Sequence, residues 1–292
     1  MTMPWDGRGL PPAAQERLAR AQDAHVATSM LSVPSAAGIE SVGLRAVGEV
    51  MGCSVYRFAT QWFGFCGYGG FGGNGGFVAA NALPAVPQYQ AAMRTAWNLA
   101  LARMRAEAEA LGAHGVVGAA RTVKSLDSND REFVLMGTAV RFTGATETPL
   151  TAPFIAEQSG TDTAKLLLAG WLPLLPIMGI SVMIRHDDMR TRSQMGVFSG
   201  NTEVSGLTDL VTSARDEARA DLRRSAKAAS AEGVLLTTQE SRTFEVEPAE
   251  GHRDHVMEQT YFGTALGRCP ANLIPQSQNP LDFLPITMLP VS

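Results

Sequence analysis

The chain has 292 residues, enough for about two domains of ordinary size. Its 24 Lys and Arg residues nearly balance its 28 Asp and Glu residues, so the charge gives no reason to expect a nucleic-acid-binding surface. The three cysteines are too few and too irregularly spaced for a disulfide framework or a four-cysteine zinc site. The first residues lack the apolar core of a secretory signal, which predicts a cytoplasmic protein.

The chain begins with an N-terminal arm, residues 1–36, in which an amphipathic stretch at 13–24 predicts a short helix. A first unit follows over 37–144 and opens with a strand through the motif MGCSV at 51–55. A glycine-rich insertion at 64–77 comes next. It contains the spacing GxGxxG, but no helix opens directly after it, so we expect a loop with interleaved aromatic residues rather than a nucleotide site.

The remainder of the first unit predicts one long helix and a hairpin. Apolar residues recur every three or four positions from Met93 to Leu111, and Gly112 supplies a stop. We interpret Glu107 as part of the charged, solvated side of this helix. Two strands, roughly 115–126 and 132–142, then pair across a polar turn. The order of elements is therefore β-α-β-β.

After a linker at 145–162, a second unit over 163–269 repeats this order. The motif MGISV at 178–182 corresponds to MGCSV of the first unit. A helix is expected over about 211–229, with Thr208 as its N-cap. Strands at roughly 234–246 and 256–266 are joined by a polar loop. The two helices differ on their apolar faces, because Trp97 of the first corresponds to Arg215 of the second.

Residues 166–184 contain no charge and reach the length of a membrane span. Pro173 and Pro176 would interrupt a helix there, and the counterpart at 42–58 carries Arg45 and Glu49. We therefore expect a strand buried on both faces at 177–184. Association with a membrane through 166–184 is the weaker alternative.

The chain ends in a tail, residues 270–292, with a proline at every fifth position from Pro270 to Pro290 and apolar residues between them. A disordered tail normally lacks such apolar content. Because proline limits strand pairing, we expect an extended arm that lies against an adjacent surface or a partner protein.

Several motifs together resemble the YbjQ-like family, often labelled a heavy-metal-binding domain. They are GEVMG at 48–52, ALGA at 110–113, GVVG at 115–118 and GTAV at 137–140, with GTA at 263–265 as a looser echo in the second unit. The resemblance implies an α+β fold of two tandem dodecin-like β-α-β-β units, each a small antiparallel sheet packed on one long helix. It also implies assembly into rings, typically pentamers, and it implies neither an activity nor a cofactor.

One group of residues has the chemistry of a metal site. His252, Asp254 and His255 lie in the loop predicted between the last two strands, and His186 precedes two aspartates elsewhere in the second unit. Imidazole and carboxylate groups bind Zn²⁺ and similar divalent transition metals. The alternative is a polar turn whose side chains bond to their own backbone.

These features predict a non-enzymatic protein that forms homo-oligomeric rings, since no nucleophile, base and orienting group can be assembled from the motifs. Binding of a metal or small ligand by the four residues above is the alternative function. Neither a catalytic residue nor a cofactor-binding residue is predicted.

Overall fold

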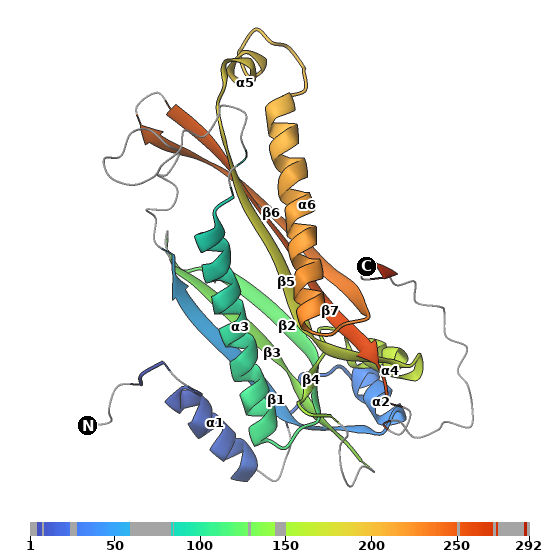
Figure 1. The fold of residues 1–292 in the computed structure, drawn as a ribbon. Helices are drawn as coiled ribbons and strands as arrows, with labels where there is room; N and C mark the ends of the chain where they lie inside the picture. Colours follow the sequence, from blue (N-terminus) through green and yellow to red (C-terminus); the bar gives the residue numbers. More distant parts are fainter. Residues whose placement is uncertain are drawn as a thin grey trace.

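The computed structural model describes residues 5–7, 9–23, 28–58, 83, 85–127, 130–143, 150–249, 252–270, 273 and 289–290. They form a mixed α+β fold with two four-stranded sheets, each crossed by one long helix (Figure 1). The predicted glycine-rich insertion at 64–77 and residues 274–288 of the predicted C-terminal arm lie outside the described residues.

The first sheet has the strand order β1-β3-β2-β4, and helix α3 crosses it next to β1. Its strands are antiparallel except for the short parallel pair of β2 with β4. The elements of this half are α1 (Pro12–Asp23), α2 (Val33–Ser41), β1 (Leu44–Arg57), α3 (Pro87–Ala110), β2 (Gly115–Ser125), β3 (Asp130–Phe142) and β4 (Phe154–Ile155).

The second sheet has the order β5-β7-β6-β8, and helix α6 crosses it next to β5. Both halves thus run strand, long helix, strand, strand, and in both the last of these strands lies between the other two. The elements are α4 (Gly160–Leu168), β5 (Trp171–His186), α5 (Met189–Gln194), α6 (Ser205–Ala228), β6 (Gly233–Ala249), β7 (His252–Arg268) and β8 (Leu289–Pro290).

A glycine lies where each long helix crosses its strand. A Cβ on Gly52 would lie 1.8 Å from the carbonyl oxygen of Ala100 on α3, and a Cβ on Gly179 would lie 2.4 Å from that of Ala218 on α6. The glycines of the two matched motifs are therefore the residues that let the helices approach so closely.

Polar side chains on each helix also bond to the outward edge of the strand. On α3, Glu107 accepts from the amide of Met51 at 2.7 Å, and Arg103 donates to the carbonyl of Cys53 at 2.6 Å. The corresponding positions of α6 hold Ser225, which donates to the carbonyl of Met178 at 2.9 Å, and Asp221, which accepts from the amide of Ile180 at 2.9 Å. Edge groups that would otherwise be left unpaired are thus satisfied in both halves.

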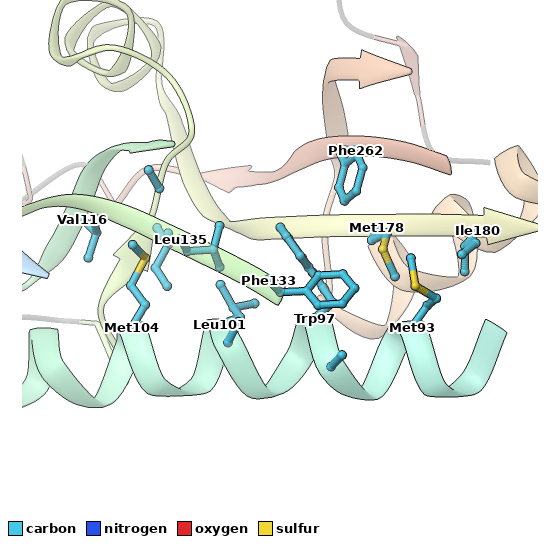
Figure 2. Packing of buried hydrophobic residues seen from close by; sticks show 14 of the residues in the cluster. Met93, Trp97, Leu101, Met104, Val116, Phe133, Leu135, Met178, Ile180 and Phe262 are labelled. Carbon is cyan, nitrogen blue, oxygen red and sulfur yellow. The ribbon is translucent and has the colours of Figure 1, made fainter. Parts of the chain in front are cut away.

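One hydrophobic cluster joins the two halves (Figure 2). Trp97 of α3 lies against Phe262 of β7, with ring centroids 5.3 Å apart, and Phe133 of the first sheet belongs to the same cluster as Met178 and Ile180 of the second. The second sheet therefore has α6 on one face and the first half on the other. This accounts for the nearly continuous burial of β5 and β7.

The strand predicted at 177–184 is confirmed, because it forms the central part of β5. Residues 166–168, the start of the uncharged stretch, belong instead to α4. Within the described part of the chain, no helix is both long and apolar enough to cross a membrane.

Three sequence-based predictions are wrong in detail. Helix α6 begins at Ser205, and its N-cap is Val204, whose side chain makes no capping bond, rather than Thr208. The predicted loop between the last two strands is largely strand, because β6 and β7 stay paired as far as Ala249 and His252, with Pro248 at a register shift where its missing amide is tolerated. Glu107 is buried rather than solvated, at 1% exposure.

The predicted linker at 145–162 also carries structure. Phe154 and Ile155 pair with Gly115 and Val116 at the edge of β2, and α4 begins at Gly160. A short apolar stretch before a helix gave no periodicity from which this strand could be predicted.

Candidate functional site

Two histidine–carboxylate pairs lie at one end of β5 and β7. His186 and Asp254 are direct cross-strand partners, and His186 Nδ1 lies 2.5 Å from Asp254 Oδ1. His255 Nε2 lies 2.8 Å from Oδ1 of Asp187, which follows the end of β5. Three of the four residues predicted as metal ligands are thus close in space, but they are divided between two separate pairs.

Most side chains of these two pairs are buried. Asp254, Asp187 and His255 are all buried, whereas the side chain of His186 is 30% exposed. One carboxylate oxygen of Asp254, Oδ2, is buried and has no hydrogen-bond partner among the described residues. A buried oxygen of this kind normally has a hydrogen-bond partner, which is either a protein group or an ordered water.

The strand conformation explains why the predicted ligands divide. Successive residues of a strand point to opposite faces, so Asp254 and His255 cannot serve one site on β7. The side chain of His252 lies outside the described residues. Among the residues that are described, no group of three or more His, Cys, Asp or Glu side chains is arranged to hold a metal ion.

Asp188 completes this end of the sheet by capping α5. Its Oδ1 accepts from the amide of Thr191 at 2.6 Å, and its Oδ2 lies 3.3 Å from the guanidinium of Arg185. The bonds from Thr191, with smaller help from Arg185 and Arg190, lower the pKa of the Asp188 carboxyl below its usual value. The carboxylate therefore stays charged as the cap of this helix.

A second polar cluster joins the two halves of the chain. Arg131 on β3 donates two hydrogen bonds to Glu258 on β7, at 2.7 and 2.9 Å, and the hydroxyl of Tyr89 donates to the same carboxylate at 2.9 Å. Burial and the neighbouring Glu258 carboxylate raise the pKa of the Tyr89 hydroxyl, so it remains a donor. The arrangement fixes how the halves pack and contains no reactive group.

Arg121 on β2 makes a third cross-half contact. Its guanidinium lies over the ring of Phe262 at 3.6 Å and bonds to Glu157 at 2.8 Å and Glu240 at 3.3 Å. Burial raises the pKa of the Glu157 carboxyl, although bonds from Thr237 and Arg121 act in the opposite direction. The cation and both carboxylates hold β2 of one sheet against β6 and β7 of the other.

The face of the first sheet that points away from α3 carries apolar side chains beside the charged Glu132, and the described residues leave it partly exposed. We call it the outer face of sheet 1. Val55 is 56% exposed there, and its neighbours are partly exposed. The corresponding face of the second sheet is covered by the first half, and Val182, the counterpart of Val55, is fully buried. The apolar residues of the outer face of sheet 1 are Met51, Cys53, Val55, Val134 and Met136, and Glu132 lies opposite Val55 on the same side of the paired strands β1 and β3.

Sequence reasoning missed the buried charges at these contacts. Arg131, Glu258 and Asp221 gave no motif, because an ion pair between distant strands leaves no fixed spacing in the sequence. The burial of Glu107 could have been predicted, since this residue lies three positions after the buried Met104 and therefore falls on the apolar face of the helix.

Comparison with known proteins bears on the family. The profile of a family described as "Putative heavy-metal-binding" matches residues 85–143, which run from just before α3 to the end of β3. The chain is also 32% identical over 233 residues to the "Encapsulin nanocompartment protein Rv1762c" of Mycobacterium tuberculosis (strain ATCC 25618 / H37Rv), covering 77% of this chain and 81% of that protein. The chain belongs to the family of this nanocompartment protein. No solved structure matches this chain.

These matches confirm the YbjQ-like resemblance for one stretch of the chain. The matched residues end before the predicted second unit at 163–269. That this unit is a second tandem copy therefore stays a prediction.

Proposed function

We propose that this protein is a non-enzymatic homo-oligomeric assembly protein, in which a second copy of the chain covers the outer face of sheet 1. The observation that carries the proposal is the contrast between Val55, 56% exposed, and its counterpart Val182, fully buried. Exposed clusters of apolar side chains on soluble proteins are commonly interaction sites. The relative named as a nanocompartment protein supports assembly as the general role.

The finer form of the proposal is a closed ring, built from chains that each contain two tandem β-α-β-β units. The shared order of elements and the matched glycines Gly52 and Gly179 support the tandem origin. The family resemblance favours five chains in the ring. Closed rings are a common solution when one surface of a subunit binds a different surface of the next. The proline-spaced tail, 270–292, is proposed as an arm that adds contacts to a neighbouring chain or another protein.

Mass photometry of the purified full chain tests the proposal. We expect a single oligomeric species at micromolar concentration, and Val55→Asp should shift it toward monomer because a buried, unpaired carboxylate opposes association. Val197→Asp is the matched control, since Val197 is 95% exposed and lies outside the outer face of sheet 1. A monomeric wild-type protein would contradict the proposal.

A second candidate function, binding of a divalent transition metal, is favoured by one observation. The Asp254 oxygen without a partner among the described residues lies on the carboxylate that bonds to His186 Nδ1. A carboxylate in this position commonly orients a metal-binding imidazole. In this proposal His186 would bind the metal through Nε2 while Asp254 orients its ring. His252 would be a second ligand, and His255 is held separately by Asp187.

Elemental analysis of untagged protein after incubation with Zn²⁺ and desalting tests this candidate. We expect stoichiometric metal in the wild type and loss of it in His186→Ala. His114→Ala is a suitable control, because His114 directly precedes β2 of the first sheet and packs against Phe142. Metal-free wild-type protein, or equal metal in all three proteins, would exclude it.

A further inference from the structure

The outer strand of the second sheet, β6, has a long open edge. β8 pairs only with Gly233 and Val234, and the order β5-β7-β6-β8 places no other described strand beyond β6. From there β6 continues to Ala249, and all its side chains from Leu236 to Thr243 are exposed. A free strand edge of this length readily pairs with another strand.

The side chains on one face of this strand are complementary to themselves in reverse order. Alternate residues from Thr238 to Val246 share the face that points toward the first half of the chain, beyond a bulge between Leu236 and Thr238. Reading outward from Ser241 in both directions, a charge meets its opposite, and an aromatic ring then meets a threonine. The resulting pairs are Glu240 with Arg242 and Thr238 with Phe244.

We propose that β6 pairs antiparallel with β6 of a second copy, across a two-fold axis perpendicular to the sheet through Ser241. Glu240 of each chain then lies opposite Arg242 of the other, so the favourable pair occurs twice. The contact joins the second sheets of two chains into one continuous sheet. A two-fold contact cannot join neighbours within a ring of five chains, so it would join chains of two such rings. It is therefore an additional contact of the self-association proposed above and rests on that proposal.

The charges on β6 favour this pairing register over the adjacent registers. Moving the axis to Arg242 or to Glu240 would place like charges directly opposite each other, which opposes pairing. A two-fold axis that passed between two residues would pair each residue with one whose side chain points to the other face of the sheet, because side chains alternate along the strand. The α6 side of one chain would then lie beside the opposite side of the other chain. The existing contacts are compatible with the pairing. Glu240 is half exposed although it also reaches Arg121, and Arg242 lies over Phe244 at 5.4 Å.

Cysteine cross-linking tests the register directly. In a full-length background with Cys53, Cys66 and Cys269 replaced by Ser, we expect Ser241→Cys to form an intermolecular disulfide under mild oxidation. Residues directly opposite in antiparallel strands have Cβ atoms close enough for this bond. Gln239→Cys is the matched control on the same face of the strand. It should stay unlinked, because Thr243 lies opposite it, and the double variant Gln239→Cys/Thr243→Cys should link again.

A charge exchange tests the pairing energetically. Glu240→Arg and Arg242→Glu should each raise the dissociation constant of the two-fold contact about tenfold or more, since each places two like-charged pairs across the axis. The double exchange Glu240→Arg/Arg242→Glu should restore the wild-type value.

The outcomes separate this inference from the proposed function. If the wild-type protein assembles but Ser241→Cys stays unlinked, or if the single exchanges leave the assembly unchanged, the β6 contact is wrong and the proposed function stands. If the wild-type protein is monomeric, both are wrong.

Discussion

Arg131 and Glu258 join the two sheets through a bidentate ion pair. The two side chains are 13% and 9% exposed and lie in different halves of the chain. Tyr89 of α3 donates a third bond to the same carboxylate, so three elements distant in sequence meet at one group. Because a buried charge is costly without its partner, this contact makes the packing of the halves sensitive to single substitutions.

Arg131→Ala should therefore destabilise the protein by about 3–5 kcal/mol, since it leaves the Glu258 carboxylate buried beside one neutral donor. Urea unfolding followed by circular dichroism measures the loss. Arg57→Ala is the matched control, because the ion pair of Arg57 with Asp130 lies on the surface, with Arg57 75% exposed, and solvent screening leaves it little effect on stability. Equal losses for the two variants would contradict the role given to Arg131.

Gly52→Ala and Gly179→Ala should each destabilise the protein by about 1–3 kcal/mol or more, because the added methyl group meets helix backbone that cannot move aside locally. Gly48→Ala tests whether contact distance decides the loss. A Cβ at Gly48 meets only the end of the Leu111 side chain, at 3.0 Å, and should be tolerated better. The same unfolding measurement ranks the three variants, and a larger loss at Gly48 would show that helix approach is not what these glycines provide.

Cys53 should react slowly with thiol reagents. Burial, followed by the charge of Glu132 and its hydrogen bond to the thiol, raises the pKa of Cys53, so little reactive thiolate forms near neutral pH. In Glu132→Gln the pKa should fall, and the rate of alkylation at a fixed pH should rise. Rates measured by mass spectrometry across a pH series give both values. An unchanged rate profile in the variant would show that Glu132 does not control this thiol.

Asp162 should make stability depend on pH at the start of α4. Bonds from Ser159 and Lys165 lower its pKa below the ordinary value of 3.8. Its stabilising contribution is therefore present above 3.8 and is lost as the pH falls through the lower, folded-state value. Asp162→Asn should be less stable than wild type at neutral pH, and the difference should shrink in acid. A difference that stays constant across urea titrations at several pH values would contradict this assignment.

Local elements of the fold could be predicted where a pattern of short range decides them. The spacing of Met93, Trp97 and Met104 predicted α3, and its stop at Gly112 is explained by the positive φ of 62° that glycine adopts there. The hairpin of β2 and β3 followed from two apolar runs around a polar turn. These signals depend on residues that are close in the sequence, so they do not depend on how the rest of the chain packs.

The candidate sites could be predicted only in part. His186, Asp254 and His255 were identified by chemistry, but their division into two pairs depends on the register of β5 with β7, which the sequence does not state. The β6 edge was missed because its residues read as an ordinary polar strand. Only the order of the strands within the sheet shows that no described strand pairs along most of one side of β6.

The difference between Trp97 and Arg215 has a consequence for assembly. Trp97 helps to form the surface on which the second half packs, whereas the corresponding position of α6 carries an exposed arginine. If α6 also carried a tryptophan at this position, it would offer the same apolar surface as α3, and a further chain could pack on it. Chains could then add to one another without limit. A contact that repeats without closing produces fibres. With Arg215 at this position, α6 lacks the aromatic side chain through which α3 packs against the other half.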